Sequence, residues 1–164
     1  MAVVEAPARD HSAVADATTR CTPEAREKPT VVPTLLFAGA AASLAYAVLF
    51  WYRFDYLGHF VAGFGLTTLL TGVLSRRVRV VASVAMSVGL TLVAGLVSEL
   101  LFFTSFLFDP VDIANLMLGG LLAAACLGTR EIDRRDQRAL VVVGVIGILL
   151  GLYVRFGSLD PRGW

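Results

Sequence analysis

Five polar side chains in an otherwise apolar sequence are able to do chemistry together: Asp55, His59, Glu99, Asp112 and Asn115. Carboxylates and an imidazole can exchange protons, hold a divalent cation or bind the polar groups of a ligand. Asp55 and His59 are spaced i,i+4, and Asp112 and Asn115 are spaced i,i+3, so each pair shares one face if its segment is helical. In the first pair, we expect the carboxylate of Asp55 to orient or charge the imidazole.

The carboxylates differ in how far helix formation alone explains them. Asp109, Pro110 and Asp112 have the order N-cap, first helical position and first turn, which starts a helix without any other role. Glu99 is followed by an apolar run and has no cation near it in the sequence. Because an ionisable residue inside an apolar helix is costly, we expect Glu99 to face the interior of a bundle and to be functional.

The other candidates have structural explanations that stay open at this point. Asp55 and His59 could be an interfacial pair that begins a helix. Asn115 with Gly119 and Gly120 could serve helix packing, since amides bond across helices and glycines let backbones approach. Both explanations compete with a shared polar site.

The composition indicates which environment surrounds these residues. Of 164 residues, 57% are hydrophobic and 16% are charged, and the mean hydropathy is +0.74. These values argue against a soluble enzyme with one buried core and against disorder over most of the chain. The net charge of +1 offers no footprint for nucleic acid. Cys21 and Cys126 match neither a disulfide framework nor a metal motif, so we interpret both as free thiols.

The elements that must position the polar residues are apolar segments of about 20 residues, the length that crosses a bilayer. They cover residues 34–52, 59–75, 80–104, 111–128 and 139–156, of which the second and fourth are short. We predict an all-α fold, an integral membrane bundle of about five transmembrane helices over residues 34–156. Residues 1–33 are predicted to be a disordered cytoplasmic tail, and residues 157–164 a short extracytoplasmic tail.

The basic residues predict the orientation of this bundle. Residues 76–79 and 130–138 are arginine-rich connections, and the positive-inside rule places them in the cytoplasm with the N-terminus. The C-terminus is then extracytoplasmic, and the protein lies in the plasma membrane. The aromatic residues expected near the outer boundary are Trp51, Tyr52, Tyr56, Tyr153 and Trp164. A helix that starts at Val80 rises about 28 Å to Glu99, which places the five polar residues near the outer face.

The order of these motifs resembles the VanZ-like family of small bacterial membrane proteins: Asp55 and His59 open one helix, Glu99 lies late in the next, and a D-x-x-N-x-x-x-G stretch from Asp112 opens another. Residues 55–64 are also similar to the D-x-x-G-H-F-x-x-G-F stretch of the YjdF-like membrane family. The resemblance covers about residues 54–128. It implies a role in the cell envelope and an association with resistance to teicoplanin-type glycopeptide antibiotics.

Three hypotheses for function follow. In the first, the five polar residues bind a glycopeptide antibiotic or a lipid-linked envelope precursor, with membrane lipid as the other partner and with no cofactor or metal. In the second, the protein is an intramembrane enzyme with His59 or Glu99 as general base and, in one version, a divalent metal held by Asp55, His59, Glu99 and Asp112. No strong catalytic signature supports it, and no catalytic residue is assigned. In the third, the chain is a proton-coupled or structural subunit.

Overall fold

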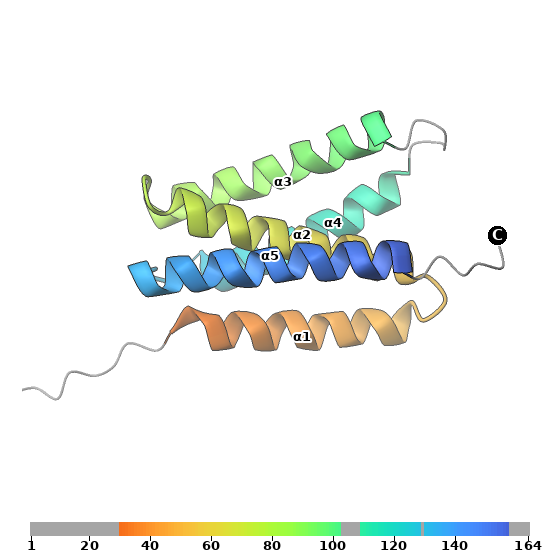
Figure 1. Cartoon of the computed structure of the whole chain (residues 1–164), viewed down its shortest axis with the longest axis horizontal. Coiled ribbons are helices and arrows are strands. Elements are labelled where there is room, and N and C mark those ends of the chain that lie inside the picture. The colour runs from red at the N-terminus through yellow and green to blue at the C-terminus, as the bar shows by residue number, and fades with distance from the viewer. Residues whose placement is uncertain (1–29, 103–108, 129, 158–164) are drawn as a thin grey trace, which may run out of the picture.

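The computed structural model describes residues 30–102, 109–128 and 130–157, which form five helices packed side by side (Figure 1). The helices are α1 (Val31–Leu49), α2 (Phe54–Leu74), α3 (Val80–Phe102), α4 (Pro110–Leu127) and α5 (Arg134–Gly157). Each is long and apolar enough to cross a membrane. The all-α prediction is confirmed, and the chain is a multi-pass membrane protein.

Some helix boundaries differ from those expected. Helix α1 begins at Val31, inside the predicted tail, and the rest of that tail with Cys21 lies outside the described residues. Helix α2 begins at Phe54, before the expected start at residue 59. The acidic Asp55 in its first turn makes this part of the helix look like a connection in the sequence. Helix α4 begins as expected, with the Asp109 side chain accepting a 2.8 Å hydrogen bond from the Val111 amide after Pro110.

Helix α2 is the most buried of the five and lies against α5 over most of its length. Glycines make this contact possible, because they let two backbones approach within reach of each other. A Cβ added to Gly65 would lie 2.6 Å from the Ile148 amide nitrogen, and one added to Gly144 would lie 2.5 Å from the Leu69 amide nitrogen. The α2–α5 interface is therefore a backbone-to-backbone contact.

The crossing of α2 and α4 is equally close. A Cβ on Gly63 would overlap the carbonyl oxygen of Leu116, and a Cβ on Gly119 would overlap the carbonyl oxygen of Phe60. The two glycines thus hold α2 and α4 together one helical turn from His59. This crossing sets the distance between the polar residues of the two helices.

A hydroxyl pair links the middle of α3 to α2. The Oγ1 atoms of Thr67 and Thr91 lie 2.9 Å apart, and both side chains are fully buried. Thr68, also fully buried, instead donates to the Phe64 carbonyl of its own helix, at 2.7 Å. Interhelical hydroxyl bonds of the first kind help to fix neighbouring helices in lipid.

Basic and aromatic side chains divide between the two ends of the bundle. The arginines of residues 76–79 and 130–138 gather where α1 and α5 begin, and Gln137 Nε2 donates to the Ser75 carbonyl there, at 3.3 Å. Among the described residues, the opposite end carries Arg53 and Arg155. It also carries the aromatic residues Trp51, Tyr52, Tyr56 and Tyr153, whereas Arg162 and Trp164 lie outside the described residues. We call the end with Trp51 the aromatic end.

Candidate functional site

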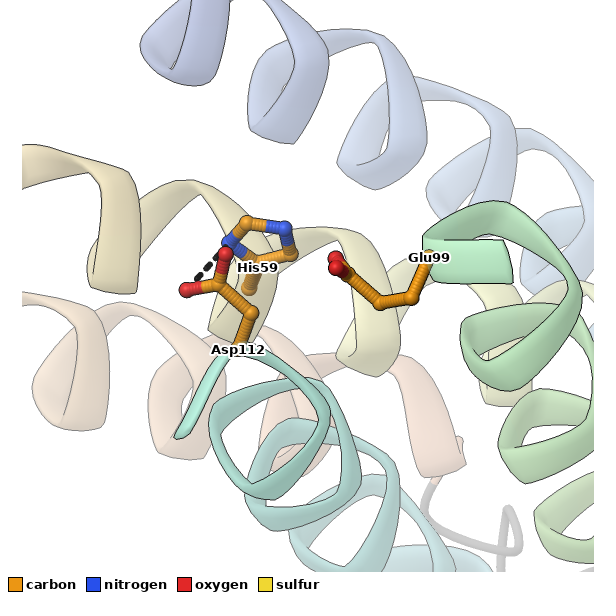
Figure 2. Close-up of side chains that lie close together, drawn as sticks. All are labelled: His59, Glu99 and Asp112. Atoms are coloured by element: carbon orange, nitrogen blue, oxygen red, sulfur yellow. Dashed lines mark ion pairs between the residues drawn. The ribbon is translucent and has the colours of Figure 1, made fainter. Parts of the chain in front are cut away.

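Three ionisable side chains from three helices meet at the aromatic end of the bundle. His59 lies in the second turn of α2, Glu99 near the end of α3, and Asp112 in the first turn of α4. One ligand atom from each of the three lies within 4.8 Å of the other two. Figure 2 shows the imidazole between the two carboxylates, with Glu99 pointing toward it from the side opposite Asp112. We call these three residues the polar cluster.

The polar cluster is buried. Glu99 is 8% exposed and Asp112 is 7% exposed, while the His59 side chain is 15% exposed. The expectation that Glu99 faces the bundle interior is confirmed. Burying two carboxylates this close together is unfavourable unless positive charge or hydrogen-bond donors compensate them.

The contacts of His59 determine which of its ring nitrogens carries a lone pair. Nδ1 lies 3.0 Å from the backbone carbonyl oxygen of Asp55 and 3.5 Å from Oδ1 of Asp112. A carbonyl oxygen can only accept, so Nδ1 must carry a hydrogen. Nε2 is therefore the ring nitrogen that is available to bind a cation or to accept a proton.

Asp55 belongs to a different contact, and the expected pairing of its carboxylate with the imidazole is wrong. Arg53 donates from Nε to Oδ1, at 3.2 Å, and from Nη2 to Oδ2, at 3.0 Å. Arg53 directly precedes α2, and a two-point guanidinium–carboxylate pair is stronger than a single contact to an imidazole. The hydrogen bond to the Asp55 carboxylate raises the pKa of Arg53, which also stacks over Tyr56 at 4.1 Å. The carboxylate beside His59 is that of Asp112.

Asn115 lies one turn beyond Asp112, as the i,i+3 spacing predicted, and contacts α1. Its Oδ1 accepts a 2.8 Å hydrogen bond from the hydroxyl of Tyr46, whose ring stacks on Phe60 at 4.4 Å. Asn115 is 6% exposed. The amide therefore links α1 to α4 one helical turn beyond the polar cluster along α4.

Two buried polar atoms beside the cluster lack a hydrogen-bond partner among the described residues: Oδ1 of Asp112 and Nδ2 of Asn115. Buried polar atoms in proteins are nearly always satisfied, and those that are not require an explanation. An acceptor and a donor on one face of α4 match a ligand that offers both a cationic or donor group and an acceptor group.

Tyr46 contacts the candidate site but was not among the residues singled out from the sequence. It lies in the apolar run of α1, where an aromatic ring is expected on packing grounds alone. The usable signal was the hydroxyl, because the O–H of a tyrosine packed among helices usually finds a hydrogen-bond partner. Which partner it has depends on how α1 packs against α4.

The composition of the polar cluster decides what it could hold. One imidazole and two carboxylates are a ligand set suited to a divalent ion such as Zn²⁺ or Mn²⁺. The same groups could act as a general base and its orienting partner. Asp55, by contrast, is occupied by Arg53 through both carboxylate oxygens.

Comparison with known proteins gave no match: no protein-family model, no curated protein and no solved structure is significantly similar to this chain. The argument for its function therefore depends on the residues of the polar cluster and their surroundings.

Proposed function

We propose that the chain is a multi-pass protein of the bacterial plasma membrane that binds a lipid-linked envelope precursor at its polar cluster. The observation that carries this proposal is the meeting of His59, Glu99 and Asp112 from three separate helices within 4.8 Å. Three helices that each place an ionisable side chain at one depth of a membrane bundle are better explained by a shared ligand than by three separate structural needs.

The distribution of arginines supports an outward-facing site. Seven arginines lie in the two arginine-rich connections, residues 76–79 and 130–138. The positive-inside rule places that end in the cytoplasm, so the N-terminus is cytoplasmic and the C-terminus is extracytoplasmic. The aromatic end with the polar cluster then faces outward.

The depth of the cluster favours a lipid-linked ligand over a free glycopeptide. Glu99 and Asp112 are buried among helices at the aromatic end of the bundle, and amphipathic rings favour the headgroup level. A lipid-linked headgroup is held at this depth by its own chain, whereas a bulky water-soluble antibiotic must leave water to reach the same groups. The resemblance to the VanZ-like family adds an expected phenotype, resistance to teicoplanin-type glycopeptides.

The experiment compares Glu99→Gln with wild type and a deletion strain for glycopeptide susceptibility, at matched membrane expression. We expect Glu99→Gln to be as susceptible as the deletion, because the amide keeps the shape and loses the charge. Asp109→Asn is the matched control, since asparagine also caps a helix and Asp109 lies outside the cluster. A deletion phenotype that Glu99→Gln does not share would refute a functional role for the cluster.

A second measurement identifies the ligand. The purified protein in nanodiscs is titrated with a short-chain polyprenyl diphosphate sugar and, separately, with teicoplanin. Saturable binding of the diphosphate, weakened by Glu99→Gln but not by Asp109→Asn, supports the proposal. Binding of teicoplanin but not of the diphosphate would mean that the antibiotic is the ligand.

Hydrolysis of the same ligand is a second candidate function, favoured by the orientation of His59. With Nδ1 bonded to the Asp55 carbonyl, Nε2 can take a proton from water as that water attacks a phosphoanhydride, whose P–O bond breaks to give a polyprenyl phosphate and a sugar phosphate. Release of the sugar phosphate from the diphosphate probe that His59→Gln abolishes would establish this activity. Binding without release would leave the protein a receptor.

A further inference from the structure

We infer that His59, Glu99 and Asp112 form a site for one divalent cation of the zinc or manganese type. The site stands on the geometry of the polar cluster alone. Its role, to bridge the cluster to the phosphates of a lipid-linked headgroup, rests on the proposed function. Two buried carboxylates repel a phosphate, and a cation between them turns that repulsion into attraction.

The three side chains offer ligand atoms of the right kind at nearly the right separation. Zn²⁺ binds nitrogen and oxygen at about 2.0–2.2 Å, so ligands of one ion lie roughly 3–4 Å apart. The ligand atoms here lie within 4.8 Å of one another. The Glu99 side chain reaches toward the imidazole from α3 (Figure 2), so its carboxylate is the group that would move to close the remaining gap.

The unpaired carboxylate oxygen of Asp112 is an independent indication of a directly bound cation. Its Oδ1 is buried without a hydrogen-bond donor, and the residue is only 7% exposed. Nδ1 of His59 lies 3.5 Å from this oxygen but is bonded to the Asp55 carbonyl instead. A coordinated cation satisfies such an oxygen, whereas diffuse positive charge does not.

His59 has the second contact that metal-binding histidines usually have. A histidine ligand generally donates its other ring N–H to a carbonyl or carboxylate, which fixes the tautomer and the orientation of the ring. The Asp55 carbonyl does this for Nδ1 over 3.0 Å. The lone pair of Nε2 is thereby available for the ion.

Charge balance without a metal is the main competing arrangement. A protonated His59 and the guanidinium of Arg155, whose charge acts on both Glu99 and Asp112, could neutralise the two carboxylates. That arrangement leaves Oδ1 of Asp112 without a hydrogen bond. It also predicts that chelators have no effect on the protein, which makes the two arrangements separable.

Three protein ligands leave part of the coordination sphere for an exogenous group. Zinc sites that act on substrates generally have three protein ligands and one open position, whereas structural sites have four. An oxygen of a headgroup phosphate is a suitable ligand for the open position. The polar cluster therefore matches a substrate-binding metal site and not a structural metal site.

The test uses the full chain purified in detergent, stripped with a chelator and equilibrated with ZnCl₂ or MnCl₂. We expect one ion per chain by elemental analysis and a rise in melting temperature on loading. Glu99→Gln and Asp112→Asn should each weaken binding by about 100-fold or more, beyond the 10–100-fold typical of outer contacts. Asp109→Asn should bind as wild type does.

Several outcomes overturn the inference. Wild type without a stoichiometric ion, or Asp112→Asn with unchanged affinity, rules out the site. Because an imidazole nitrogen suits Zn²⁺ better than Mg²⁺ or Ca²⁺, equal binding of the latter pair rules out the assigned class. Glu99→Gln preserves side-chain volume, so it tests the site even if the other variant fails to fold.

The diphosphate probe separates this inference from the proposed function. Binding of the probe that chelation abolishes and ZnCl₂ restores supports both. Probe binding that persists in stripped protein refutes the bridging role and leaves the receptor function intact. A stoichiometric ion in protein that binds no probe refutes the receptor function and leaves the metal site intact.

Discussion

The imidazole of His59 takes its orientation from the backbone of Asp55, whose carbonyl oxygen accepts the Nδ1 proton over 3.0 Å. The contact connects consecutive turns of α2, so it persists as long as the helix does. The carboxylate of Asp55 is bound to Arg53 and has no part in it. The i,i+4 spacing therefore matters through the main chain and not through the acid.

This relationship predicts that Asp55→Asn leaves the His59 ring in its Nδ1–H form. The substitution removes the charge that pairs with Arg53, in a contact whose two side chains are 37% and 22% exposed. Such pairs contribute about 0–1 kcal/mol. Ring ¹⁵N NMR of a His11→Gln background, which retains a single histidine, should show the same tautomer with and without the substitution. A switch of tautomer in Asp55→Asn would mean that the carboxylate does orient the ring.

The α2–α4 crossing predicts a sharp contrast between glycines. Gly63→Ala and Gly119→Ala each place a methyl group against a backbone carbonyl of the facing helix, which cannot move alone. Overpacking of this kind typically costs about 1–3 kcal/mol. Gly89, which has nothing within 4 Å of its added Cβ, is the matched control. Thermal unfolding in detergent should show lower stability for the first two variants and no loss for Gly89→Ala, and equal melting of all three would contradict the crossing.

The hydroxyl pair between α2 and α3 predicts energetic coupling. Thr67→Val and Thr91→Val remove the two sides of one 2.9 Å hydrogen bond, so their effects should be less than additive. Couplings of this kind average about 0.6 kcal/mol and reach about 1.7 kcal/mol. Thr68→Val combined with Thr91→Val is the control and should be additive, because Thr68 bonds to its own helix. Additivity in both cycles would mean that the interhelical bond contributes nothing.

The proposed orientation predicts which ends of the bundle a membrane-impermeant thiol reagent reaches. In a background with Cys21→Ser and Cys126→Ala, Tyr52→Cys at the aromatic end should react in intact cells. Val78→Cys, between the arginines, should react only after the cells are permeabilised. Tyr52 is 60% exposed and Val78 is 38% exposed, so burial within the protein does not confound the comparison. The reversed pattern would place the polar cluster in the cytoplasm.

The fold followed from the sequence because long apolar runs and arginine-rich connections are local features. Helix α4 was predictable even at its first residue, since Asp109 and Pro110 encode its start. The start of α2 was not, because the first turn of the helix contains Asp55 and looks like a connection. Here the close packing of α2 against its neighbours outweighs the weak local signal.

The sequence predicted the level at which the site residues lie along their helices, but not which of them contact one another. Counting residues from Val80 placed Glu99 at the level of His59, and the structure agrees. Pairing Asp112 with His59 depends on how α2 and α4 cross at Gly63 and Gly119, which no local spacing reveals. The contribution of Tyr46 depends in the same way on the packing of α1 against α4.

The position of α2 at the centre of the bundle has a consequence for how the protein is made. Helix α2 is the second of the five helices to leave the ribosome, yet the helix that covers Gly58, Gly65 and Gly72, α5, is the fifth. During biogenesis this backbone face of α2 must therefore remain in lipid, or against a membrane insertase, until α5 has been made. Quality control that senses unpaired transmembrane helices has its longest opportunity at this step, so a weakened α2–α5 contact should lower the amount of protein in the membrane before it alters the polar cluster.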